Sequence, residues 1–277
     1  MNAVFELCPF DVCQREFMQR ALVAAFLIGL AAPAIGVFLV QRRLSLMGDG
    51  IGHVAFAGIA AGFLFGIAPV STALLAAVIG AVALEFLRSR GRMAGDVALA
   101  LIFYGGIAGA VFMTSLSNLS NANLIGYLFG SVVTVDTMDV TLSAAIAIAV
   151  LGTTFLLRKE LFAVCYDEDV ARTSGLNARA LNLLIAVIAA VTVAVTMRVV
   201  GILLVSAMLV LPVAAALQLT RSFRATVLVS LALGAIESVG GLTVAYYGDY
   251  PPGATIVLGA IAVFGIPATF RMVTSRG

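Results

Sequence analysis

The chain has 277 residues, of which 62% are hydrophobic and only 11% are charged, with a mean hydropathy of +1.13. A soluble globular domain carries about 25% charged residues, so the composition excludes that class and indicates an integral membrane protein. The formal net charge of +2 says little by itself, and the positions of the charges are more informative.

Apolar runs bounded by charged or turn residues predict an all-α polytopic bundle of about nine transmembrane helices, forming a single domain over residues 1–277. Another apolar piece, at 123–135, is too short to span, and we expect it to be re-entrant or to pack against the bundle as a half-helix. The nine predicted spans have approximate limits of 21–40, 51–68, 70–87, 97–113, 139–157, 181–197, 199–217, 225–245 and 254–270.

The basic residues orient these spans. Of the 16 Lys and Arg, only Arg15, Arg20 and Arg198 fall on one side of the predicted membrane. By the positive-inside rule, the side with most of the Lys and Arg residues is cytoplasmic, so we expect the N-terminus outside and the C-terminus inside. Segment 1–20 is then extracytoplasmic, and segment 158–182 is the longest polar connection on the cytoplasmic side. The cytoplasmic side holds Arg42, Arg43, Arg88, Arg90, Arg92, Arg158, Lys159, Arg172, Arg179, Arg221, Arg224, Arg271 and Arg276.

Asp49 and His53 stand where the second predicted span begins, and His53 is the only histidine of the chain. On a helix their spacing of four places both side chains on one face, about 6 Å apart. Ionisable groups at membrane depth are costly, so such a pair is a candidate functional site. The alternatives are that Asp49 caps the helix N-terminus and that His53 makes an inter-helix hydrogen bond to a carbonyl.

Glu237 lies inside the eighth predicted span without a basic residue in the same span. It needs neutralisation by a proton, by a partner across the bundle, or by a cation. Glu85 is close to Arg88, where an ion pair is the simpler explanation, and Asp136 and Asp139 are placed to cap a helix. One imidazole and two carboxylates suit Zn²⁺ or Mn²⁺, so we predict Asp49, His53 and Glu237 as metal contacts.

The cytoplasmic segment 158–182 contains DEDVARTSGL, which predicts a short helix that begins after Asp167 and is ended by Gly175. Ala171 and Gly175 are small and four residues apart, which gives a flat face on which another protein could sit. The alternative is an ordinary amphipathic loop.

Four segments, in order, resemble the membrane permease subunits of ATP-binding-cassette importers for zinc and manganese. The likeness covers essentially the whole length. One departure is Gly52, where family members often carry serine before the histidine. The segments are G48-D49-G-I-G-H53-V-A, the helix with Asp167, Ala171 and Gly175, V200-G-I-L-L-V205 leading to Pro212, and P251-P-G-A-T-I-V-L258.

The resemblance implies a permease homodimer in a prokaryotic plasma membrane, paired with a separate cytoplasmic ATPase and an extracytoplasmic metal-binding solute receptor. Asp167, Ala171 and Gly175 would match the coupling helix that docks on the ATPase. Asp49 and His53 would match residues of the pathway that contact the ion. Glu237 lies where the family places an acidic residue in one of its last spans. The transported metal would be zinc first and manganese next. We expect no permanently bound cofactor, and lipid but no nucleic acid as a further partner.

The sequence independently supports the expectation that a separate subunit hydrolyses ATP. Lys159 is the only lysine and follows Arg158, so the chain has no Gly-Lys-Ser/Thr phosphate-binding loop, and ATP would act through the partner subunit. The sequence also lacks a His-Glu-x-x-His motif, which disfavours an intramembrane metalloprotease. The alternative left open is a self-contained, proton-coupled secondary metal transporter with Glu237 or His53 as its proton site.

Overall fold

A computed structural model describes residues 12, 14–89, 95–116, 126–128, 130 and 135–274, and every extended regular element among them is a helix. The all-α prediction is confirmed for this part of the chain. The helices are α2 (Glu16–Gln41), α3 (Met47–Phe65), α4 (Pro69–Ser89), α5 (Gly95–Leu116), α7 (Thr137–Leu156), α8 (Arg158–Tyr166), α9 (Glu168–Thr173), α10 (Ala178–Val200), α11 (Ile202–Leu219), α12 (Phe223–Gly248) and α13 (Pro252–Thr274).

Each predicted span falls on a helix, and seven of these helices are long and apolar enough to cross a membrane: α2, α3, α4, α5, α7, α10 and α12. Helices α11 and α13 contribute shorter apolar stretches within the described residues, Leu204–Leu219 and Pro252–Gly265. The chain is therefore a multi-pass membrane protein. Nine crossings and the orientation of the two termini stay predictions.

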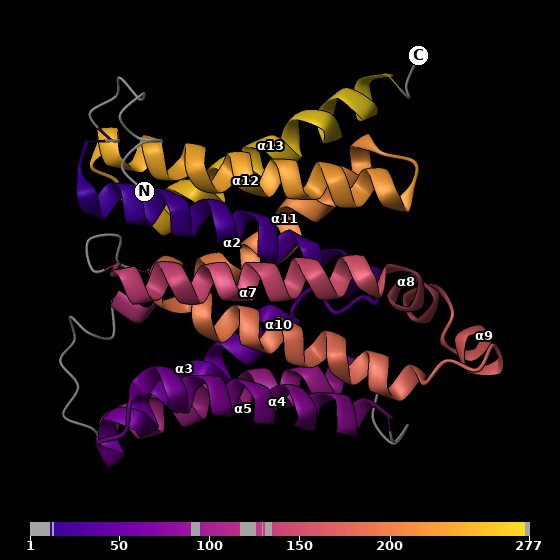
Figure 1. The fold of residues 1–277 in the computed structure, drawn as a ribbon, viewed down its shortest axis with the longest axis horizontal. Coiled ribbons are helices and arrows are strands. Elements are labelled where there is room, and N and C mark those ends of the chain that lie inside the picture. The colour runs from indigo at the N-terminus through magenta and orange to yellow at the C-terminus, as the bar shows by residue number, and fades with distance from the viewer. Residues whose placement is uncertain are drawn as a thin grey trace.

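The helices form two groups joined by a central pair. Helices α3, α4 and α5 pack together on one side, and α2, α11, α12 and α13 pack together on the other (Figure 1). Between them, α10 contacts α2, α3 and α4, and α7 contacts α2 and α10. Helices α8 and α9 project from one end of the bundle, beyond the end of α7 (Figure 1).

Glycines bring several helix backbones into direct contact, as expected where bundles pack in lipid. A Cβ added to Gly234 of α12 would lie 2.3 Å from the Gly29 carbonyl oxygen of α2, and one added to Gly36 would lie 1.9 Å from the Leu209 oxygen of α11. In α3, a Cβ on Gly58 would lie 2.6 Å from the Thr72 oxygen. Backbone atoms cannot move aside as side-chain ends do, so these positions fix the helix spacing.

Gly201 separates α10 from α11 with φ 86° and ψ 155°, a conformation that non-glycine residues avoid. Only residues 126–128, Gly130 and Val135 of the predicted half-helix at 123–135 belong to the described part of the chain. A Cβ on Gly130 would lie 2.5 Å from the carbonyl carbon of Val200, so this residue packs on the α10–α11 junction. The rest of the 123–135 prediction falls outside the described residues.

We predict that Gly234→Ala lowers the stability of the detergent-solubilised protein by about 1–3 kcal/mol, because the new methyl group must push α12 away from α2. Gly240→Ala is the matched control on the same helix, since a Cβ there meets no atom within 4 Å. Thermal unfolding of the two variants measures the difference. Equal midpoints would contradict backbone contact between α2 and α12.

Candidate functional site

Asp49 lies inside the first turn of α3 and does not cap it. The helix begins at Met47 after Leu46, which makes no side-chain capping bond, so the N-capping alternative for Asp49 is wrong. The side chain is half-buried. At this position an acidic side chain interacts favourably with the partial positive charge of the helix N-terminus.

His53 follows one turn further along α3 and is also half-buried. Its ring meets Phe103 of α5 edge to face, with the ring centroids 5.1 Å apart. It acquires no hydrogen bond from any residue in the described part of the chain, so the carbonyl-bonded alternative is not observed there. Asp49 lies close enough to act on the imidazole electrostatically. The structure thus brings together the predicted pair.

Two close contacts position this turn of α3. A Cβ added to Gly106 of α5 would lie 2.7 Å from the Val54 nitrogen and 3.0 Å from the His53 carbonyl carbon. On the opposite side, a Cβ on Gly52 would lie 2.8 Å from Cγ2 of Ile202 in α11. The departure from serine at position 52 therefore has a steric reason, because Ile202 fills the space that a serine would need.

Glu237 lies apart from this pair. It is 6% exposed on α12, and neither carboxylate oxygen finds a hydrogen-bond partner among the described residues. Helix α12 packs on α2, α11 and α13, whereas α3 packs on α4, α5, α10 and α11. No three His, Cys, Asp or Glu side chains gather into a metal site in the described part of the chain. In this conformation Asp49, His53 and Glu237 do not form one three-ligand cluster.

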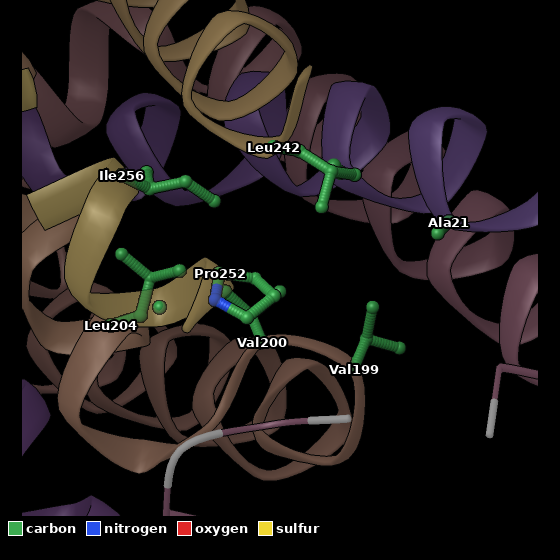
Figure 2. Close-up of a pocket in the computed structure, with 9 residues that line it drawn as sticks. Ala21, Val199, Val200, Leu204, Leu242, Pro252 and Ile256 are labelled. Atoms are coloured by element: carbon green, nitrogen blue, oxygen red, sulfur yellow. The ribbon is translucent and has the colours of Figure 1, made fainter. Parts of the chain in front are cut away.

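A small cavity where α2, α12, α13 and the α10–α11 junction meet is too apolar to serve as an ion site. Its volume is about 20 Å³, and its lining is almost entirely hydrocarbon (Figure 2). A desolvated cation needs oxygen, nitrogen or sulfur ligands, which these side chains do not offer. The lining residues are Ala21, Ala25, Val199, Val200, Leu204, Leu242, Pro252, Gly253 and Ile256.

Comparison with known proteins agrees with this architecture over nearly the whole chain. The sequence profile of the ABC 3 transport family matches residues 14–271. The chain belongs to the ABC 3 transport family. It is 33% identical over 250 residues to a probable metal transport system membrane protein of Treponema pallidum, covering 90% of this chain and 94% of the relative.

A second relative is the manganese import system permease protein ScaB of Streptococcus gordonii, with 30% identity over 249 residues, covering 90% of this chain and 89% of ScaB. Among solved structures, a chain of PsaBC from Streptococcus pneumoniae in complex with Fab superposes with a TM-score of 0.82 and 28% identity. The match covers 96% of this chain and 95% of that chain. This member of the family is thus a permease and not itself the ATPase.

The predicted coupling segment of the permease folds as α8 followed by the short helix α9. Asp167 caps α9 by accepting hydrogen bonds from the backbone nitrogens of Asp169 and Val170, both at 3.0 Å. Gly175 follows the helix with φ 85°, the left-handed region that favours glycine. The prediction of a short helix ended by Gly175 is confirmed.

Ala171 does not form an exposed flat face, which corrects the sequence interpretation. It is 2% exposed and packs with Val164 of α8 and Ala178 of α10, so its small side chain allows α9 to pack against α8 and α10. The outward face of this region carries Tyr166, which is 81% exposed, and Val170, which is 58% exposed. A partner that docks here would contact these side chains and not Ala171.

A charged cluster lies where the C-terminal ends of α2 and α4 meet, and α8 contacts the same end of α2. Arg88 donates to Glu85 at 3.0 Å, which confirms the predicted ion pair, and Arg42 lies 4.0 Å from the same carboxylate. Burial lowers the pKa of Arg42, with a further contribution from Arg88. The Cys165 thiol of α8 donates to the Phe38 carbonyl, and burial raises its pKa to about 11.

Sequence reasoning did not find Phe103, Gly106 or Ile202. Phe103 and Ile202 are ordinary apolar residues in apolar helices, and only the fold brings them to α3. A glycine pair on α5 offered a weak signal, but the tight contact is made by Gly106 and not by its neighbour Gly105, whose Cβ would meet nothing within 4 Å.

Because Gly106 holds α5 against the His53 backbone, we predict that Gly106→Ala uncovers the imidazole and accelerates its modification by diethyl pyrocarbonate. The permease has a single histidine, so the reaction reports on that residue alone. Gly105→Ala is the control and should react at the wild-type rate. Equal rates for both variants would contradict the positioning role of α5.

The thiol of Cys165 should react slowly with alkylating reagents in a Cys8→Ser/Cys13→Ser background. With a pKa of about 11, about one thiol in a thousand is ionised at pH 8, and the reactive thiolate increases about tenfold for each pH unit up to that pKa. In the control, Ser174→Cys is combined with Cys165→Ser. The exposed thiol at position 174 should react rapidly, and its alkylation rate should stop increasing with pH near pH 9. If the alkylation rate of Cys165 itself stopped increasing near pH 9, the thiol would not be buried by α8.

Proposed function

We propose that this chain is the transmembrane permease domain, over residues 1–277, of an ATP-binding-cassette importer that moves a divalent metal ion into the cytoplasm. The observation that carries the proposal is the family match across residues 14–271. Support comes from relatives of nearly equal length named as metal-transport and manganese-import membrane proteins. A family resemblance of this extent concerns the whole molecule and not one motif.

The ion contacts begin with Asp49 and His53. Their half-buried position, without a capping bond at Asp49 or a hydrogen bond to His53 in the described residues, leaves a carboxylate oxygen and an imidazole nitrogen free for a cation. Two ligands from one helix hold an ion weakly, which suits transport better than a closed structural site. Glu237 acts at a second point of the route, because it lies on α12, whose main contacts in the described part of the chain are with α2, α11 and α13.

The transported ion is manganese or zinc. Carboxylate and imidazole ligands accept both, so the side chains do not choose between them. The resemblance of the sequence motifs ranked zinc before manganese. Because ScaB is named a manganese import permease, manganese is the first ion to test.

ATP acts through a separate subunit. The permease pairs with a second copy of itself, with a cytoplasmic ATPase that docks on α8 and α9, and with an extracytoplasmic solute receptor that delivers the ion. Docking would move α8, and the buried contacts of α8 with α2 and α10 would carry that motion into the bundle. Transport by alternating access also requires that the ion bind more tightly in one state than in the other.

The comparisons do not favour the alternative of a proton-coupled secondary transporter, which depends on Glu237. The carboxyl group of Glu237 is buried without a hydrogen-bond partner in the described residues, and the alternative would use this group as its proton site. A single buried acid is also compatible with an importer. The family match therefore keeps the importer as the leading proposal.

Replacing His53 by Ala, or Asp49 by Asn, should reduce manganese uptake at least about tenfold, because loss of one of two ligands costs about 1.4 kcal/mol or more. Cells that express the complete transporter would be assayed with the radioactive metal, and membrane expression would be measured in parallel. Asp96→Asn, at an exposed residue in the first turn of α5, serves as a control for loss of a carboxylate away from the α3 pair. Normal uptake by both variants would refute the site assignment.

Gly175 offers a matched pair of substitutions for the coupling role. Valine strongly disfavours φ 85°, whereas asparagine tolerates the left-handed region. We predict that Gly175→Val distorts α9 and abolishes stimulation of the ATPase by the permease, and that Gly175→Asn retains most of it. ATP hydrolysis by the reconstituted complex is the readout. Full stimulation in the valine variant would remove α9 from the ATPase interface.

A further inference from the structure

A large cavity opens on the side of the bundle where α2, α7, α8 and α12 meet. Its volume is about 670 Å³, far larger than that of the small cavity of Figure 2. Its mouth carries Phe155 and Leu228, which are 70% and 68% exposed, so it opens toward the lipid-facing surface. The lining residues are Ala34, Phe38, Leu151, Thr154, Phe155, Arg158, Lys159, Phe162, Ser222, Phe223, Arg224, Val227, Leu228 and Leu231.

Three positive charges stand at one end of this otherwise apolar cavity. Arg158 and Lys159 begin α8, and Arg224 lies in the first turn of α12. All three side chains are exposed, and none is within 4.0 Å of a carboxylate in the described part of the chain. Arg158 rests over the Phe155 ring, 4.9 Å from its centroid, and none of the described residues that line the cavity is acidic.

The ligand that fits this arrangement has a long apolar part and an anionic head. Hydrocarbon in the cavity would contact Leu151, Val227 and Leu231, while a phosphate would lie against the three cations. Phospholipids of the cytoplasmic leaflet have this chemistry, and basic pockets between transmembrane helices on that side bind anionic headgroups. The choice of leaflet rests on the proposed orientation, which places these three residues on the cytoplasmic side.

We propose that this cavity binds one anionic phospholipid of the cytoplasmic leaflet. Its phosphate is held by Arg158, Lys159 and Arg224, and one acyl chain lies between α2, α7 and α12.

The bound lipid would stabilise the contacts that hold α8 of the coupling segment against the transmembrane helices. Phe223 of α12 contacts Phe38 of α2 and Phe162 of α8, with ring centroids 5.7 and 4.6 Å apart, and Phe162 stacks on Tyr166 at 5.9 Å. Phe38, Phe162 and Phe223 also line the cavity. An acyl chain there would pack on the same rings that connect α8 to the transmembrane helices.

The test measures lipid binding to the full-length permease by native mass spectrometry in detergent, with dioleoyl phosphatidylglycerol and dioleoyl phosphatidylcholine as probes. Wild type should retain phosphatidylglycerol preferentially. Each basic side chain near an anionic headgroup strengthens binding about fivefold, so Arg158→Gln/Arg224→Gln should bind it about 25-fold more weakly. The control Arg43→Gln/Arg179→Gln removes the same charge from exposed residues outside the cavity and should bind as wild type does.

Two further measurements separate the proposal from other occupants. Val227→Phe keeps every charge but places a larger side chain in the part of the cavity proposed for the acyl chain, and it should lower phosphatidylglycerol binding. Glycerol 3-phosphate should not displace the lipid from wild type. Equal retention of the two lipids, or an unchanged preference in the Arg158→Gln/Arg224→Gln variant, would overturn the proposal. So would a structure of the assembled transporter with a protein segment in the cavity.

Discussion

Direct contact between helix backbones at glycine is the constraint on which the rest of this bundle depends. Lipid offers helices no hydrophobic drive to associate, so close packing of small residues must hold them together. Gly29 and Gly234 fix α12 against α2, and Gly36 fixes α11 against α2. Gly106 does the same for α5 and α3 at the turn that carries His53. The same kind of contact therefore builds the bundle and sets the position of its candidate site.

The two functional regions lie in different parts of this framework. The Asp49–His53 pair belongs to the group of α3, α4 and α5, whereas α8 contacts α2, α7, α9 and α10. Helix α10 touches both regions and is the direct structural connection between them. Glu237 lies in the opposite group on α12, so an ion that meets both acids must pass from one helix group to the other. A relative movement of the two groups about α10 would change that route.

The sequence predicted the helical class, the positions of the spans, the capping of α7 by Asp136 and Asp139, and the end of α9 at Gly175, because each depends on local pattern. The Asp49–His53 pairing was predictable for the same reason, since both residues share one helix. The separation of Glu237 from that pair, the burial of Ala171 and the fit of Ile202 against Gly52 depend on contacts between distant segments. Hydrophobic periodicity carries little information about such contacts in helices that are apolar on nearly all sides.

We propose that this permease moves a metal ion only with energy from a partner subunit. The most direct test is manganese uptake into proteoliposomes that contain the permease, with its ATPase, its solute receptor and ATP each supplied or omitted. We expect uptake only when all of them are present. Uptake by the permease alone, driven by a pH gradient, would contradict it and identify a secondary transporter.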